Sequence, residues 1–225
     1  DNYVDLLGNE VTALVSDEFQ KLYDGGAYVI TPQAQTMWMD GGDGNYQNGD
    51  KGSMYEKTLF ELIQNVVKNN SEIDPDRIII GGCSNGGYMT MEMVLKHPDY
   101  FLKAYPICEA FYDEFITDDM LKAVKKGGTE FWFTYAKNDT TVDPTLTAMP
   151  TIKRMQKLGI PVHTSVWDDV HDTTGRFWLD EDGQLTSEKT GTPYQYMGHW
   201  SWIYFDNNSN ICDDCKKNEW KWMAE

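Results

Sequence analysis

The spacing of apolar residues alternates between a helical period and short continuous runs. Residues 10–24 show the helical period, and residues 27–31 form a short apolar run that predicts a strand. The segment 40–52 is rich in glycine, aspartate and asparagine and is predicted to be a loop. Ser53 and Glu56 then have the spacing of a capping box ahead of an apolar stripe, which predicts a helix that begins at Ser53.

Residues 77–81 contain three consecutive isoleucines, a run typical of a central parallel strand that is buried on both faces. The same patterns predict these further elements: a helix at 88–96, strands at 101–108 and 130–136, a helix at 146–158, a strand at 161–167, and helical segments within 198–207 and 213–225. This alternation indicates one α/β domain over residues 1–225, with a mostly parallel sheet between layers of helices.

Residues 168–197 interrupt the alternation with a long, polar segment punctuated by glycine. A structureless segment of this length inside a compact domain is usually functional. We therefore expect an insertion or a lid-like loop there.

The net charge of the chain argues against nucleic acid as a partner. Asp and Glu number 36 against 19 Lys and Arg, for a net charge of −17, and such a surface repels nucleic acid. The longest apolar runs are too short for a membrane helix, so no membrane partner is expected. The sequence does not open with a basic segment followed by an apolar run, the pattern of a signal peptide. An acidic surface nevertheless suits a secreted or extracellular enzyme. That is the expected location, and the cytoplasm is the alternative.

The strongest chemical motif is Gly82-Cys83-Ser84-Asn85-Gly86, a G-x-S-x-G sequence between a predicted strand and a predicted helix. That context is the one in which the motif forms a nucleophile elbow, a sharp turn that presents a serine hydroxyl at the edge of a sheet. Ser84 is therefore the candidate nucleophile. The backbone N–H of Asn85, at the start of the following helix, is a candidate oxyanion donor.

A serine nucleophile needs a histidine base and an acid that orients it, which follow the serine in the order acid, then histidine. The loop after the predicted strand 130–136 offers Asp139, which comes first, and Asp143, which could simply cap the next helix. For the base, His171 and His199 both lie beyond the last predicted strand, and spacing alone leaves the choice between them open.

The spacing of cysteine, histidine and acidic residues along the sequence does not indicate a metal or cofactor site. Cys212 and Cys215 form a C-x-x-C pair, but no second such pair or histidine pair lies nearby in the sequence. A local disulfide and two free thiols are equal alternatives for them. The acidic stretch 180–183 lacks the spacing of a calcium loop. We expect neither a metal nor an organic cofactor.

Several motifs resemble the α/β-hydrolase esterases related to polyhydroxybutyrate depolymerases, feruloyl esterases and predicted peptidases of the prolyl-oligopeptidase type. The matching stretches are Asp74-Pro75-Asp76-Arg77-Ile78 before the elbow, Thr31-Pro32-Gln33 with Trp38, Tyr105-Pro106-Ile107-Cys108, and Gly198-His199-Trp200-Ser201-Trp202. The resemblance implies a three-layer α/β-hydrolase sandwich with Ser84 as nucleophile, Asp139 as acid and His199 as base. It thereby favours His199 over His171.

One feature of that family has no counterpart in the sequence. The family carries an early strand that ends in a His-Gly-Gly-type turn and supplies a second oxyanion N–H. The first strands of the sheet are therefore expected to be missing, and a further N-terminal segment of the same protein is a candidate partner.

The resemblance implies cleavage of a carboxylic ester, with a serine peptidase and an inactive binding module as alternatives. Trp38 and Trp200 lie in segments expected near the site, and aromatic walls suit an aromatic or polymer-linked ester of the feruloyl or polyester type.

Overall fold

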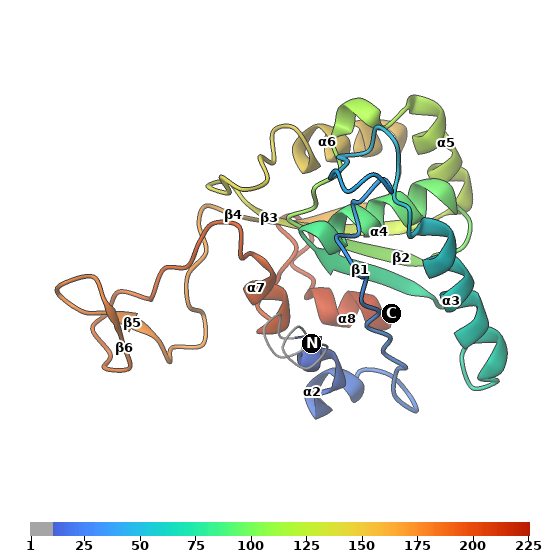
Figure 1. Cartoon of the computed structure of the whole chain (residues 1–225). Helices are drawn as coiled ribbons and strands as arrows, with labels where there is room; N and C mark the ends of the chain where they lie inside the picture. Colours follow the sequence, from blue (N-terminus) through green and yellow to red (C-terminus); the bar gives the residue numbers. More distant parts are fainter. Residues whose placement is uncertain (1–10) are drawn as a thin grey trace.

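The computed structural model describes residues 11–225 and centres on a parallel sheet in the strand order β1-β2-β3-β4 (Figure 1). The four strands are β1 (Ile79–Cys83), β2 (Lys103–Ile107), β3 (Glu130–Ala136) and β4 (Val162–Trp167). Each neighbouring pair is parallel, and in register Ile79 faces Lys103 and Phe131 faces Val162. Sequential parallel strands require crossover connections, and helices provide most of their length.

Helices cover both faces of this sheet, so the domain has three layers (Figure 1). One face carries α3 (Glu56–Asn69), α4 (Asn85–Lys96), α5 (Asp118–Gly127) and α6 (Ala148–Leu158). The other carries α2 (Asp17–Gln20), α7 (Trp202–Asp206) and α8 (Glu219–Ala224). The expected α/β sandwich with a mostly parallel sheet is confirmed.

Among the described residues, the two largest of three apolar clusters lie on opposite faces of the sheet and hold the layers together. The larger lies between the sheet and α4, with Tyr88, Met91 and Met93 fully buried. The smaller lies on the opposite face, where Trp132 of β3 packs against Trp222 of α8 with ring centroids 5.5 Å apart. Apolar burial on both faces is the physical reason that β2 and β3 are mostly apolar, with Lys103, Glu130 and Thr134 as exceptions.

The prediction that residues 77–81 form a strand buried on both faces is wrong in part. Strand β1 begins two residues later, and all five of its residues are only half-buried. Among the described residues, β1 pairs with β2 alone and is therefore an edge strand. The run of isoleucines correctly indicates a strand, but no strand within residues 11–225 covers its second edge.

The strand predicted at 27–31 does not form either. This segment is extended but pairs with no strand among the described residues, and Tyr28 and Ile30 are 57% and 42% exposed. An apolar run becomes a strand only where another strand offers hydrogen bonds, which periodicity along one segment does not reveal.

The helix predicted at 10–24 divides into a 3-10 helix, η1 (Val11–Val15), and α2, while its residue 10 lies outside the described part. Ser16 causes the break, because its side chain accepts the N–H of Phe19 as an N-cap. The capping box predicted at Ser53 is also wrong. The Ser53 hydroxyl accepts the N–H of Tyr55 instead, and α3 begins at Glu56.

Two elements lie where no helix was predicted: η2 (Asp113–Phe115) and α5. The sequence does carry signals for α5, because Thr117 caps its start and Gly128 ends it in a left-handed conformation. Residues 168–197 form an arm that extends away from the sheet (Figure 1). A short hairpin of β5 (Trp178–Leu179) and β6 (Leu185–Thr186) occupies it. Whether the arm acts as a lid stays a prediction. In the described part of the chain, no helix has the length and apolar character needed to cross a membrane.

Candidate active site

Ser84 lies on the sharp turn between β1 and α4. Its backbone has φ 54° and ψ −114°, a conformation that non-glycine residues rarely adopt. Two bonds hold the turn: the Ser84 N–H donates to the Ile107 carbonyl at 2.9 Å, and the Ser84 carbonyl accepts the Tyr88 N–H at 2.8 Å. This is the strand–turn–helix geometry of a nucleophile elbow.

Two glycines around Ser84, Gly82 of the motif and Gly87 directly after it, are required by close backbone contacts, whereas a Cβ at Gly86 would meet no atom within 4 Å. A Cβ at Gly82 would lie 2.8 Å from the carbonyl carbon of Gly86. A Cβ at Gly87 would lie 2.8 Å from the Cα of Glu109, on the segment after β2. Side chains at these positions would push α4 away from the sheet and displace Ser84.

Ser84, His199 and Asp139 form one hydrogen-bonded relay. His199 Nε2 lies 2.8 Å from Ser84 Oγ, and His199 Nδ1 lies 2.7 Å from Asp139 Oδ2. The other oxygen of Asp139 accepts the backbone N–H groups of Thr141 and Val142, each at 2.9 Å. These bonds fix the carboxylate, which in turn holds the His199 ring with Nε2 directed at the serine.

The loops that carry the histidine and the acid touch at a glycine. A Cβ at Gly198 would lie 2.3 Å from Oδ1 and 2.5 Å from the carbonyl oxygen of Asn138. Only glycine permits this approach, and it places His199 next to Asp139. The glycine before the histidine therefore has a steric role that the sequence motif alone does not explain.

The alternative acid and base lie elsewhere. Asp143 Oδ1 accepts the backbone N–H and the hydroxyl of Thr145, which is a local turn. His171 Nδ1 lies 2.7 Å from Asp169 Oδ1 at the base of the arm. The structure thus brings Ser84, Asp139 and His199 together and brings neither Asp143 nor His171 to them.

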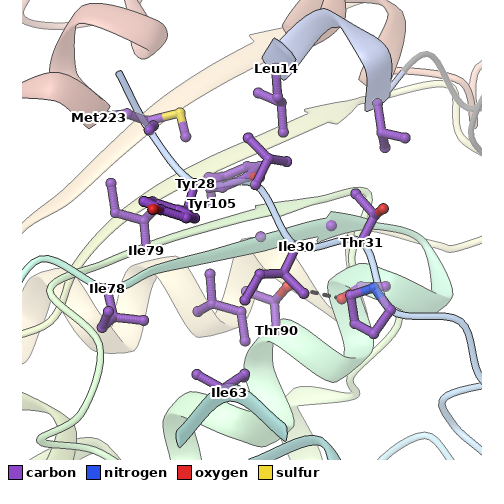
Figure 2. A pocket seen from close by; sticks show the side chains of 18 of the residues that line it. Leu14, Tyr28, Ile30, Thr31, Ile63, Ile78, Ile79, Thr90, Tyr105 and Met223 are labelled. Atoms are coloured by element: carbon purple, nitrogen blue, oxygen red, sulfur yellow. Dashed lines mark hydrogen bonds between the residues drawn. The ribbon is translucent and has the colours of Figure 1, made fainter. Parts of the chain in front are cut away.

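A large cavity opens beside the relay, with a volume of about 1290 Å³. Ser84, Asn85, His199 and Trp38 are among the residues that line it. It runs along the open edge of β1. Figure 2 shows Ile78 and Ile79 on that edge, with Tyr28 and Ile30 on the segment that crosses in front. The lining is mostly apolar, which suits an apolar acyl group.

Of the two tryptophans that follow His199, Trp200 does not take the position expected for it. Trp200 is 40% exposed and is not among the described residues that line the cavity. Trp202 lines it instead, and its ring meets the His199 ring edge-on with centroids 5.6 Å apart. Trp202 ends the same Gly-His-x-Ser-Trp stretch, so the motif contained a signal for it.

Asn85 is the first residue of α4, where the backbone N–H has no partner within the helix. Its side chain is held by the Met39 N–H, which donates to Asn85 Oδ1 at 3.0 Å and ties the Trp38 segment to the elbow. No other oxyanion donor is apparent in residues 11–225. Since the second edge of β1 is open there, a further strand with a second donor stays a prediction.

Two buried groups follow β2: Cys108, whose sulfur lies within 4.8 Å of the ligand atoms of Asp139 and His199, and Glu109 beside it. Cys108 follows β2 with φ 37°, and burial raises the pKa of its thiol well above the usual value. Glu109, beside it, is buried, and desolvation raises the pKa of its carboxyl to about 8. One of its oxygens accepts the Phe111 N–H. Both residues therefore lie in a weakly polar environment as neutral groups at moderate pH.

Sequence comparison finds two matches. Residues 42–139 match the prolyl oligopeptidase family. The poly(3-hydroxyalkanoate) depolymerase C of Paucimonas lemoignei is 32% identical over 93 residues, which are 38% of this chain and 21% of the depolymerase. The match thus spans about a fifth of the length of that relative.

Solved structures of similar shape include a thermostable esterase, with a TM-score of 0.48 and 24% identity over 68% of this chain and 34% of the esterase. Another is SOBER1 of Arabidopsis thaliana, with a TM-score of 0.45 and 15% identity over 68% of this chain and 81% of SOBER1. The parallel sheet, the elbow and the relay described above, together with the sequence matches, give this chain the α/β-hydrolase fold.

Proposed function

We propose that this protein is a carboxylic ester hydrolase that acts through an acyl-enzyme on Ser84. The observation that carries the proposal is the relay itself: a strained serine at the start of a helix, 2.8 Å from an imidazole that a buried carboxylate holds at 2.7 Å. The same arrangement, in which a histidine contacts a serine on one side and a carboxylate on the other, performs acyl transfer in enzymes of several unrelated folds.

The reaction follows from these contacts. His199 Nε2 accepts the Ser84 hydroxyl proton as Oγ attacks the ester carbonyl carbon. The carbonyl oxygen becomes an anion, toward which the Asn85 N–H donates. The tetrahedral intermediate collapses, and His199 gives the proton to the leaving alcohol. Water, activated by His199 in the same way, then attacks the acyl-enzyme and releases the acid and Ser84.

The aromatic residues Trp38 and Trp202, which line the cavity together with Ser84 and His199, support an aromatic or polymer-linked ester as substrate. The Paucimonas relative is named for depolymerising a polyester, which supports the polymer-linked class. Trp38, on the cavity wall beside the elbow, is proposed to contact the acyl group.

A serine peptidase is the second candidate, because residues 42–139 match a family named for oligopeptide cleavage. Both candidates share the relay, so only substrates separate them. Short-chain p-nitrophenyl esters, a feruloyl ester and a peptide p-nitroanilide are to be compared on the wild type and on Ser84→Ala. The ester proposal predicts ester turnover that Ser84→Ala abolishes and little amide turnover. Amide turnover without ester turnover would favour the peptidase. No turnover, together with no labelling by a fluorophosphonate, would favour a binding module.

A further inference from the structure

A second cluster of reactive side chains lies on β4, the strand at the opposite side of the sheet from β1. It comprises His163, Cys212 and Cys215, whose ligand atoms all lie within 4.8 Å of one another. The histidine is 49 positions before the first cysteine. This separation explains why the C-x-x-C pair showed no metal-ligand spacing along the sequence.

The distances fit a tetrahedral metal centre. His163 Nδ1 lies 3.6 Å from Cys212 Sγ and 3.5 Å from Cys215 Sγ. A zinc ion bonded to sulfur at about 2.3 Å and to nitrogen at about 2.0–2.1 Å, with tetrahedral angles, places those two atoms about 3.6 Å apart. Both nitrogen–sulfur distances therefore equal the separation that such an ion imposes.

The loop between the cysteines has a fixed shape that directs both sulfurs to one side. The Cys215 N–H donates to Cys212 Sγ at 3.1 Å, which ties the second cysteine to the sulfur of the first. Lys216 has φ 56°, and its N–H donates to the Cys212 carbonyl at 3.1 Å, which closes the turn. The strained, left-handed residue directly after the second cysteine is thus part of the turn that brings the two sulfurs together.

The loop is also anchored on the strand that carries the histidine. Asp213 Oδ2 accepts the Thr164 hydroxyl at 2.8 Å and the Val166 N–H at 3.1 Å, and the Asp213 N–H donates to the Thr164 carbonyl at 2.8 Å. The aspartate between the cysteines thereby docks the loop on β4. It places the C-x-x-C pair over His163 without itself joining the cluster.

Hydrogen bonding without a metal accounts less well for this arrangement. A neutral imidazole has one acceptor nitrogen with one lone pair, so it can accept a strong bond from only one of two thiols at equal distance. A disulfide requires the sulfurs to be about 2.05 Å apart, whereas both cysteines are free. A cation bound by all three side chains would accept a lone pair from the imidazole nitrogen and from each of the two sulfurs.

We propose that His163, Cys212 and Cys215 bind a zinc ion, with solvent as the fourth ligand. Cys215 is exposed, so water can reach the open position. Two thiolates balance the charge of the ion. The nitrogen and sulfur donors favour zinc over calcium or magnesium, which prefer oxygen.

The ion would join the end of the chain to the sheet. The His163 ring meets the Trp132 ring of β3 and the Trp222 ring of α8, with centroids 5.3 Å and 5.9 Å apart. A metal bond to His163 fixes this ring between two core tryptophans while the cysteines hold the loop that leads into α8. The site is therefore expected to stabilise the fold rather than to take part in acyl transfer.

The test is the metal content and thermal stability of protein prepared under reducing conditions without chelator. Mass spectrometry of the metals is expected to find about one zinc per chain. Removing zinc with a chelator should lower the midpoint of thermal unfolding, and adding zinc chloride should restore it. Cobalt chloride added to the metal-free protein should give the thiolate charge-transfer band and the intense visible bands of a tetrahedral site.

Substitutions assign the ligands. His163→Gln, Cys212→Ser and Cys215→Ser should each weaken zinc binding by more than about a hundredfold, because even neighbours of ligands cost about 10–100-fold. Cys83→Ser, which changes a cysteine outside the cluster, should keep zinc and the cobalt spectrum. Since a ligand variant could fail to fold, the chelation and cobalt measurements on the wild type stand independently. Wild-type protein with no zinc and no cobalt bands, or a chain lighter by two hydrogens from a Cys212–Cys215 disulfide, would overturn the proposal.

Discussion

The imidazole of His199 lies 2.8 Å from the hydroxyl of Ser84, although 115 positions separate the two residues along the chain. The contact depends on three local features: the strained turn at Ser84, the close approach of Gly198 to Asn138, and the carboxylate of Asp139 behind the ring. The importance of these features for the proposed hydrolase can be tested by experiment.

The Asp139 carboxylate is expected to hold the His199 ring in the tautomer that accepts the serine proton. Asp139→Asn keeps the shape of the side chain but disturbs that tautomer, and kcat for an activated ester should fall by about 10³–10⁴-fold with little change in KM. Asp143→Asn is the matched control, because that carboxylate bonds only within its own turn at Thr145. Equal losses in the two variants would contradict the assignment of the acid.

The two histidines beyond β4 give a second comparison. His199→Ala removes the general base and should reduce ester turnover to near that of Ser84→Ala. His171→Ala should keep kcat within about threefold of the wild type, since His171 bonds to Asp169 at the base of the arm. Activity that survives His199→Ala but is lost in His171→Ala would reverse the choice of base.

The strands after the elbow could be predicted from the sequence because each contains a short apolar run bounded by turn or helix signals. Strand β3 spans Glu130–Ala136 as expected, and β4 begins one residue later than predicted. The relay was reached through motif resemblance, since spacing alone left His171 and His199 equal. Its confirmation as a geometric contact needed the fold, because the Gly198–Asn138 approach joins two loops that no local pattern connects.

Predictions failed where a partner segment decides the structure. The apolar run at 27–31 is no strand because none of the described strands pairs with it, and β1 is half-buried because its second edge is open. The cluster of His163 with Cys212 and Cys215 was missed for the same reason, since docking of the 211–217 loop on β4 creates it. In all three cases the structure depends on contacts between segments that are distant in the sequence, and a local pattern does not reveal such contacts.

Trp38 and Trp200 provide a matched pair of aromatic substitutions for the substrate proposal. Trp38 lines the cavity beside Ser84, whereas Trp200 is 40% exposed and lies outside the described lining. Trp38→Ala should lower kcat/KM for a feruloyl ester about tenfold more than for an acetyl ester, because one lost apolar contact costs about 1–3 kcal/mol. Trp200→Ala should change both esters alike. A uniform loss for both esters in Trp38→Ala would argue against contact with the acyl group.

Glu109 is expected to make the stability of the fold depend on pH. Its pKa is raised from 4.5 to about 8 by desolvation, so the folded state keeps a proton that the unfolded state loses. Stability is therefore full below about pH 4.5 and falls as the pH rises toward 8, with an upper limit of about 5 kcal/mol at about 1.4 kcal/mol per pH unit.

Glu109→Gln removes this titration and keeps an acceptor for the Phe111 N–H. The midpoint of thermal unfolding of the variant should rise relative to the wild type between pH 5 and pH 8, as followed by tryptophan fluorescence. Parallel midpoint curves for the two proteins over this range would show that the Glu109 carboxyl does not carry the dependence.

The most direct test of the central claim is covalent labelling of the wild type and Ser84→Ala with a fluorophosphonate, followed by mass spectrometry of the peptides and by assay of p-nitrophenyl ester turnover. The account predicts one adduct, on Ser84, with loss of turnover on labelling, and neither adduct nor turnover above background in Ser84→Ala. Ester turnover that persists in Ser84→Ala, or an adduct on a different residue that abolishes activity, would contradict it.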